Sequence, residues 1–344
     1  MKYATLSCAI MLLAACGDSE PAAVSTPPPP PPASAGDLVV DAPVSHENLS
    51  IYLIRRPGAA ASADYLTLDE GLKAGTVKVT EKGDVNELMI QNDSDRPLYV
   101  QGGDVVRGGK QDRAIANDFV VPPNSEPMPI SSFCVEHGRW SAREGESTAT
   151  FAASGTAHMT GKEMKLACQV AGDQSSVWRE VAKSNESTAT ASGSPRDMLP
   201  ASGSLELMQS SEEVQKAVGA YVEKLAAVTA GRGDAVGFAF CVNGALSTVE
   251  VYGDPGIFAK LWPKLLRSAA AEALAAKGGA PAAEAVKPAD VLASIAKERD
   301  VTARQEKQTG PRSSVTVYDE AAWAACESRD AGGGVLRYQW INKR

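Results

Sequence analysis

Alternating apolar and polar positions predict β-strands over most of the first half of the chain. Residues 48–55 (NLSIYLIR) place Leu49, Ile51 and Leu53 on one face, as a half-buried strand does. Similar runs, separated by turn residues, cover residues 77–80, 87–91, 98–100, 119–121 and 128–132. Strands at this regular spacing indicate a sandwich-like or curled antiparallel sheet.

Helical signals begin within this β-rich region. Residues 65–75 (YLTLDEGLKAG) combine Thr67 and Glu70 at the spacing of a capping box with Gly75 as a C-terminal stop. A longer amphipathic helix is expected over 210–230. Asp254 and Pro255 have the residue types of an N-cap and a first helical position, so a helix should run from there towards Lys277.

The second half also contains a strong hairpin signal. Asn243-Gly244 lies between the apolar runs 235–242 and 245–252 and predicts a type I′ turn. We expect Pro263 to kink the helix that follows or to begin a second one. The serine- and threonine-rich stretches 141–156 and 184–204 are predicted to be loops. Strands are expected at 315–318 and 335–341.

These elements define the fold class as α+β, with a β-rich N-terminal half followed by a helix, hairpin and helix half. We place the boundary near residue 172, between a β-rich region 46–172 and an α+β region 173–344, and expect the two to form one structural unit. The chain has 344 residues, 44% of them hydrophobic, which suffices for a packed core. Its net charge of −8 argues against a nucleic-acid partner.

The first sixteen residues resemble the leader of a bacterial lipoprotein. Lys2 precedes a short apolar run, and Leu13-Ala14-Ala15-Cys16 resembles a lipobox. The resemblance implies a signal peptide over 1–15, cleavage before Cys16 and acylation of that cysteine, which anchors the protein in a membrane. An ordinary signal peptide with a chance cysteine is the alternative.

Residues 16–45 are predicted to tether the domain to that membrane. Pro27 to Pro32 impose a semi-rigid polyproline II spacer. The expected location is the cell envelope, with the domain facing the periplasm. Gly17, which follows the cysteine where an inner-membrane sorting signal would have Asp, favours the outer membrane.

The cysteine and histidine content limits the chemistry of the site. Cys134, Cys168, Cys241 and Cys326 could form disulfides in an oxidising envelope, and three pairings are open. None of them has CxxC spacing, and only three histidines occur, so we expect no metal site and no cofactor. Cys134 could act as a nucleophile with His137 as its base, although a structural or disulfide role is the better interpretation.

The stretch 101–140 carries the densest group of candidate site residues. Paired glycines at 102–103 and 108–109 allow bulges or anion-holding turns. The candidate binding residues are Asp104, Lys110, Gln111, Arg113, Glu136, Arg139 and Trp140. A β-hairpin with bulged, solvated ends is the structural interpretation, and Trp140 is of a type more often found in cores. Asp104 and Glu136 as an acid/base pair is a further alternative.

Three phrases in this order resemble one bacterial family: YLTLDEGLKAG, NDSDRPLYVQGGDVVRGGKQDR and VVPPNSEPMPISSFCVEHGRW. The family is the ARG and Rhodanese-Phosphatase-superfamily-associated domain family. Later segments, SSVWREVAK and VYGDPGIFAKLWPKLLRSAAAEAL, are similar to it too. Its name implies genomic association with ADP-ribosylglycohydrolase and phosphatase-like genes. This chain departs from the family pattern in having Asp104 in place of Glu, and in its lipoprotein leader.

Two functions therefore remain open. The first is a non-enzymatic envelope lipoprotein that binds an anionic small molecule or a protein partner through the glycine-rich face. The second, suggested by the family name, is a hydrolase or transferase acting on a phosphate- or ribose-containing substrate such as ADP-ribose. The second requires Asp104, Lys110, Gln111, Arg113 and Glu136 to converge in a pocket.

The lipobox makes a testable prediction. Replacing Cys16 by Ala removes the acylated thiol, so the domain should move from the membrane pellet to the soluble periplasmic fraction. Fractionation and mass spectrometry of the mature protein measure this. A variant that still pellets, together with a wild-type protein without acyl mass, would show that the anchor is elsewhere.

Overall fold

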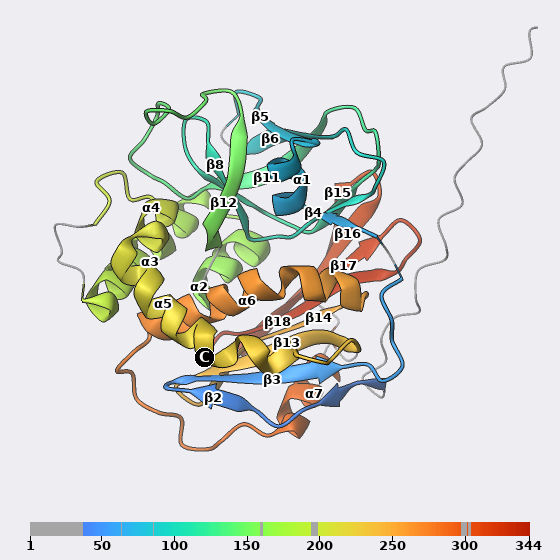
Figure 1. The fold of residues 1–344 in the computed structure, drawn as a ribbon, viewed down its shortest axis with the longest axis vertical. Coiled ribbons are helices and arrows are strands. Elements are labelled where there is room, and N and C mark those ends of the chain that lie inside the picture. Colours follow the sequence, from blue (N-terminus) through green and yellow to red (C-terminus); the bar gives the residue numbers. More distant parts are fainter. Residues whose placement is uncertain are drawn as a thin grey trace, which may run out of the picture.

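The computed structural model describes residues 37–62, 64–84, 86–158, 161–193, 199–296, 301 and 304–344 (Figure 1). The expected signal peptide, Cys16 and the tether up to residue 36 lie outside the described residues. The last part of the expected tether, 37–45, belongs to the fold, because strands β1 (Val39–Val40) and β2 (Val44–His46) pair with β3 (Leu49–Arg55).

A nine-stranded antiparallel sheet organises the structure. Its main path runs β1-β3-β13-β14-β18-β17-β16-β15, and β2 adds to β3. The remaining strands are β13 (Ala235–Val242), β14 (Ala245–Tyr252), β15 (Arg304–Gly310), β16 (Ser313–Asp319), β17 (Trp323–Asp330) and β18 (Val335–Asn342). Because β3 pairs with β13, strands from both sides of residue 172 share this sheet.

Two smaller sheets hold all the other strands of the described residues. The six-stranded sheet has the order β12-β8-β9-β11-β6-β5, and the three-stranded sheet has the order β10-β7-β4. Their strands are β4 (Leu66–Thr67), β5 (Val77–Glu81), β6 (Glu87–Asn92), β7 (Leu98–Val100), β8 (Asp104–Gly108), β9 (Arg113–Ile115), β10 (Phe119–Val121), β11 (Met128–Cys134) and β12 (Phe151–His158). The mixed composition, rich in sheet in the first half, confirms the α+β fold class.

Helices cover both faces of the large sheet. The α-helices are α1 (Leu68–Ala74), α2 (Lys162–Lys165), α3 (Gln174–Ser192), α4 (Leu205–Ser210), α5 (Glu212–Leu225), α6 (Pro255–Ala275) and α7 (Pro288–Ala296). Figure 1 shows α6 lying between the large sheet and the smaller sheets, with α7 on the opposite side of the large sheet. A π-helix, η2 (Leu166–Ala171), continues α2, and a 3₁₀ turn, η4 (Ala226–Thr229), follows α5.

Alternation along β3 explains this layering. Leu49, Ile51 and Leu53 pack in one core with α5 and α6, as the sequence pattern predicts. Tyr52 and Ile54 point the other way, into a second core with α7. Both faces of the strand are therefore buried, which explains why it has more apolar residues than a strand with one solvent-exposed face.

The structure confirms the sequence motifs that predicted a helix cap and a hairpin turn. Thr67 and Glu70 form the expected capping box on α1, and Gly75 ends that helix in the left-handed region. Asn243 and Gly244 both have positive φ, 50° and 81°, as a type I′ turn requires.

Three predictions are corrected by tertiary packing. The predicted loop 184–204 is helical up to Ser192, because Asn185, Thr188 and Ala189 are buried there, and its residues 194–198 lie outside the described residues. The predicted loop 141–156 gives way to β12 at Phe151, where it pairs with β8. Helix α6 is continuous through Pro263, so the expected second start is wrong, whereas the alternative of a kink stays a prediction. The helix buries most of its length against the sheet and α5.

A chain of buried ion pairs joins the sheets. Arg337 on β18 donates from Nε to Asp118 Oδ2 at 2.9 Å and from Nη1 to Glu250 Oε2 at 3.3 Å. Lys165 Nζ lies 3.5 Å from the other oxygen of Glu250. Asp118 also accepts from the main-chain N–H of Gly102 at 2.6 Å. The network thus connects the glycine-rich stretch to β14 and β18.

At Glu250, the effect of ion pairs and hydrogen bonds on the pKa outweighs the effect of burial. Burial alone would raise its pKa, but Lys165 and Arg337, with hydrogen bonds from Tyr252 and Gln339, lower the pKa to about 2. A carboxylate whose pKa lies below the ordinary 4.5 stabilises the fold above that pH. That contribution is lost as the pH falls towards 2.

The hairpin turn gives a prediction for stability. Gly244→Val places a β-branched residue at φ +81°, and its Cβ would lie 3.4 Å from Ala282 Cβ. The free energy of unfolding should fall by about 1 kcal/mol or more, measured by chemical denaturation. Ala245→Val, at the exposed neighbouring strand position, is the control and should be tolerated. An unchanged midpoint for Gly244→Val would contradict the turn.

Candidate functional site

The glycine-rich motif forms a tight connection between β8 and β9. Gly108 and Gly109 have φ of 131° and 55°. A Cβ on Gly108 would lie 2.8 Å from the carbonyl oxygen of Thr150, and one on Gly109 would lie 2.5 Å from the ring of Phe151. Glycine is therefore required at both positions by close packing of β12.

Asp112, at the end of this connection, is the centre of a buried charge cluster. Its Oδ1 accepts from Gly108 N–H at 3.1 Å and from Arg139 Nη2 at 3.2 Å. Its Oδ2 accepts from Arg143 Nη2 at 2.5 Å and from Ser204 Oγ at 3.1 Å. One buried carboxylate thus joins the motif turn, the loop after β11 and the start of α4.

Glu136 is the second carboxylate of this cluster. Its Oε2 accepts from Arg139 Nε at 2.7 Å and lies 3.0 Å from Arg143 Nη2. Arg139 also donates to the carbonyl oxygens of Gly108 and Gly109 at 3.3 and 2.9 Å. The arginines therefore pair with both carboxylates and with the carbonyls of the glycine turn, although Glu136 Oε1 has no hydrogen-bond partner among the described residues.

Gln111 and Arg113 lie beside this cluster. Gln111 Nε2 donates to the carbonyl oxygen of Glu136 at 2.8 Å. Arg113 Nη1 donates to the carbonyl oxygen of Gln111 at 2.9 Å, and its Nη2 lies 3.6 Å from Glu81 Oε1. Gln111, Arg113, Glu136 and Arg139 are all buried, so the expected solvated hairpin end is wrong at these positions.

The other three candidate residues lie apart from the cluster. Asp104 is buried and pairs with Lys264 of α6 at 2.5 Å. Burial raises the pKa of Asp104, and Lys264 opposes that rise. Lys110 is exposed on the motif turn. Trp140 is 59% exposed, so its interpretation as a core residue is wrong.

The cluster includes residues that the sequence did not reveal as partners. Asp112 lies within the motif, but the residues beside it in the sequence do not indicate that its buried carboxylate accepts the hydrogen bonds of two arginines. Arg143 and Ser204 lie in irregular segments without a recognisable motif, and only the fold brings them to Asp112. Their hydrogen bonds to the buried Asp112 hold three segments of the chain together.

The cysteine and histidine hypotheses can be compared with the geometry. Cys134, Cys168, Cys241 and Cys326 are all buried thiols, and none is in a disulfide. Burial raises the pKa of Cys134, which disfavours a thiolate nucleophile. His137 packs edge-on against Trp178, with ring centroids 4.5 Å apart.

Neither a metal centre nor a membrane span is found in the part of the chain that the structure describes. Within it, no cluster of three or more His, Cys, Asp or Glu side chains could hold a metal ion. No helix there combines the length and apolar character needed to cross a bilayer.

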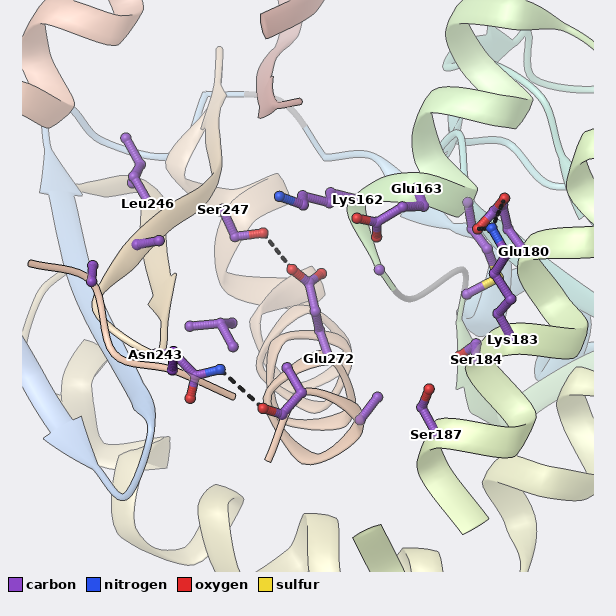
Figure 2. Close-up of a pocket in the computed structure, with 18 residues that line it drawn as sticks. Lys162, Glu163, Glu180, Lys183, Ser184, Ser187, Asn243, Leu246, Ser247 and Glu272 are labelled. Atoms are coloured by element: carbon purple, nitrogen blue, oxygen red, sulfur yellow. Dashed lines mark hydrogen bonds and ion pairs between the residues drawn. The ribbon is translucent and has the colours of Figure 1, made fainter. Parts of the chain in front are cut away.

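An open pocket lies away from the motif, between α2, α3, the β13–β14 hairpin and the C-terminal end of α6 (Figure 2). Its volume is about 560 Å³, within the usual range for small-molecule sites. Polar side chains from four elements line it, including Glu163, Lys183, Ser184, Ser247 and Glu272. The signal in the sequence was weak, because these residues are far apart along the chain.

Glu272 of α6 is the distinctive group of this pocket. The hydroxyl of Ser247 donates to its Oε1, as Figure 2 shows. Its Oε2 is shielded from solvent and has no hydrogen-bond partner among the described residues. Burial raises the pKa of Glu272, and Glu163 adds to the rise, while Lys165 and Ser247 oppose it. The pocket therefore contains a carboxylate that its own surroundings do not fully stabilise.

The fold and this pocket define an α+β protein with a polar cavity of small-molecule size beside its main sheet. The chain belongs to the ARG and Rhodanese-Phosphatase-superfamily-associated Protein domain family, whose model matches residues 37–339. The match confirms the family resemblance of the sequence motifs. Comparison with curated proteins and with solved structures found no match.

The charge cluster predicts a large loss of stability when Asp112 is replaced. Asp112→Ala leaves the buried Arg139 and the partly buried Arg143 with too little negative charge, so the free energy of unfolding should fall by about 3–5 kcal/mol. Lys110→Ala, two residues earlier on the exposed turn, should change it by no more than about 0.5 kcal/mol. Equal denaturation midpoints for the two variants would show that the cluster does not hold the fold.

Glu272 should make stability depend on pH in the opposite direction to Glu250, whose pKa is lowered. Because its pKa is raised above the ordinary 4.5, the folded state holds this proton more tightly than the unfolded state, and stability falls as the pH rises through the raised value. Glu272→Gln keeps the acceptor for Ser247 without the charge. It should match the wild type below the ordinary pKa and have a higher Tm at about pH 8. Parallel pH profiles would contradict the raised pKa.

Proposed function

We propose that this chain is a membrane-anchored lipoprotein of the bacterial cell envelope that binds a small polar ligand in the pocket of Figure 2. The observation that carries the proposal is Glu272, whose carboxylate lines the pocket with one oxygen bonded and the other without a partner among the described residues. Leaving a buried charged group unsatisfied costs stability, and such a cost is typical of a binding site.

The envelope location rests on the leader sequence. Leu13-Ala14-Ala15-Cys16 and the following proline-rich tether suit a domain held at a distance from a membrane surface. The absence of Asp after Cys16 favours the outer membrane. The described domain begins at residue 37, so the tether would give the pocket access to soluble molecules in the periplasm.

The alternative function, hydrolysis or transfer on an ADP-ribose-like substrate, was tied to convergence of the motif residues. Gln111, Arg113 and Glu136 do lie together, but their side chains are buried and bonded to the protein itself. Asp104 instead pairs with Lys264. A binding role at the separate pocket therefore has more support than catalysis at the motif.

A thermal-shift screen tests the proposed function. The full chain, purified in detergent, is heated with a panel of amines, polyols, carboxylates, sugar phosphates and ADP-ribose. At least one compound should raise the Tm of the wild type, because a ligand that binds only the folded state stabilises it. Ser187→Trp, which fills the rim of the pocket from α3, should abolish that shift.

Ala182→Trp is the matched control, since Ala182 is exposed on the same helix and does not line this pocket. It should respond to the compound as the wild type does. Retention of the shift in Ser187→Trp would place the ligand elsewhere. Release of ribose 5-phosphate or phosphate from ADP-ribose would instead favour the enzymatic alternative.

A further inference from the structure

The charged groups around the pocket do not balance. Glu163, Glu180 and Glu272 line it, against Lys162 and Lys183. Lys183 is occupied by Glu180 at 2.9 Å, and Lys162 donates to the main-chain oxygen of Arg344 at 2.5 Å. The pocket wall therefore has one more carboxylate than cations.

The interior behind the pocket does not correct this imbalance. The buried groups alternate in charge from Asp118 through Arg337, Glu250 and Lys165 towards Glu272. Lys165 lies between two carboxylates, and its Nζ is already 3.5 Å from Glu250. The two negative and two positive charges of Asp118, Arg337, Glu250 and Lys165 cancel. The negative charge of Glu272 at the pocket end therefore has no cation of its own in this series.

Glu163 strengthens the negative character at this point. Figure 2 shows Glu163 on α2 and Glu272 on α6 reaching into the pocket from neighbouring walls. Glu163 raises the pKa of Glu272, as a carboxylate close to another carboxylate does. The described residues offer Glu163 no ion pair. A cation between these two side chains would be attracted by both.

We propose that the ligand of this pocket is a small organic cation with a primary ammonium group, and that Glu272 and Glu163 hold the ammonium. The inference rests on the proposed function and specifies its ligand class. An ammonium offers three donors, so it can supply the partner that Glu272 Oε2 lacks after a small rotation of the terminal torsion. Ser184 and Ser187 on α3 provide hydroxyl groups for the rest of the ligand.

The same geometry couples binding to protons. The charges that act on Glu272 are Lys162, Glu163 and Lys165, all on α2. Glu180 and Lys183 of α3 line the opposite wall of the pocket, and Glu250 of β14 lies behind Lys165. Because burial raises the pKa of Glu272 above the ordinary 4.5, a proton competes with any other cation for this carboxylate just above that pH. An ammonium in the pocket replaces that proton, so binding should release it and become tighter as the pH rises.

Three four-carbon compounds separate charge from shape: putrescine is a dication, 1,4-butanediol is neutral and succinate is a dianion. Isothermal titration of the full chain in detergent should show binding of putrescine and none of the other two. Glu272→Gln should weaken putrescine at least about tenfold, as expected for the loss of a charge-assisted hydrogen bond. Glu186→Gln, an exposed carboxylate on α3 outside this pocket, should leave the affinity unchanged.

Titrations just above pH 4.5, where the raised pKa leaves Glu272 partly protonated, in two buffers of different ionisation enthalpy should also reveal proton release by the wild type and none by Glu272→Gln. Circular dichroism confirms that both variants are folded. If succinate or butanediol binds, or if putrescine binds Glu272→Gln as tightly as the wild type, the cation assignment is wrong while the proposed binding function stands. If no compound of this series or of the wider panel binds, both are wrong.

Discussion

Arg337 is the side chain on which the arrangement of the sheets depends. It is buried between Asp118, which holds the glycine-rich stretch through Gly102, and Glu250 of the large sheet. Removing one partner of such a buried group costs about 3–5 kcal/mol, a large part of the 5–15 kcal/mol that stabilises a typical domain. The two halves of the chain are thus joined by charges that cannot be exposed or left alone.

The same requirement explains the family motif. Gly108 and Gly109 permit the close approach of β12, and Asp112 and Glu136 neutralise the arginines that bind the carbonyls of this turn. The most distinctive residues of the sequence are therefore engaged with the protein itself. Their spacing reflects the geometry of a buried network in which each member needs the others.

Function is better sought where pairing is incomplete. Along the interior series every cation has carboxylates on either side. Glu272 at the pocket end has Lys165 behind it, and Lys162 also lowers its pKa, while the nearby Glu163 raises it. Among the described residues, Glu272 combines a carboxylate oxygen that lacks a partner with a place beside a cavity, and for that reason we propose that an external cation binds there.

The sequence by itself determined the local features, because each depends on neighbours along the chain. The capping box of Thr67 and Glu70, the Asn243-Gly244 turn and the inward face of β3 are of this kind. The family and the α+β class also followed from residue patterns. For the same reason, the serine-rich end of α3 was mistaken for a loop, since local propensity there is overridden by burial of Asn185 and Thr188.

Only the tertiary structure decided which polar groups meet. Asp112 meets Ser204, Asp104 meets Lys264, and Glu272 meets Ser247 across separations that no local pattern encodes. Whether a carboxylate becomes a structural anchor or a binding group depends on the cations that the fold places around it. That balance is a property of three-dimensional proximity in a low-dielectric interior, and it therefore appears only once the chain is folded.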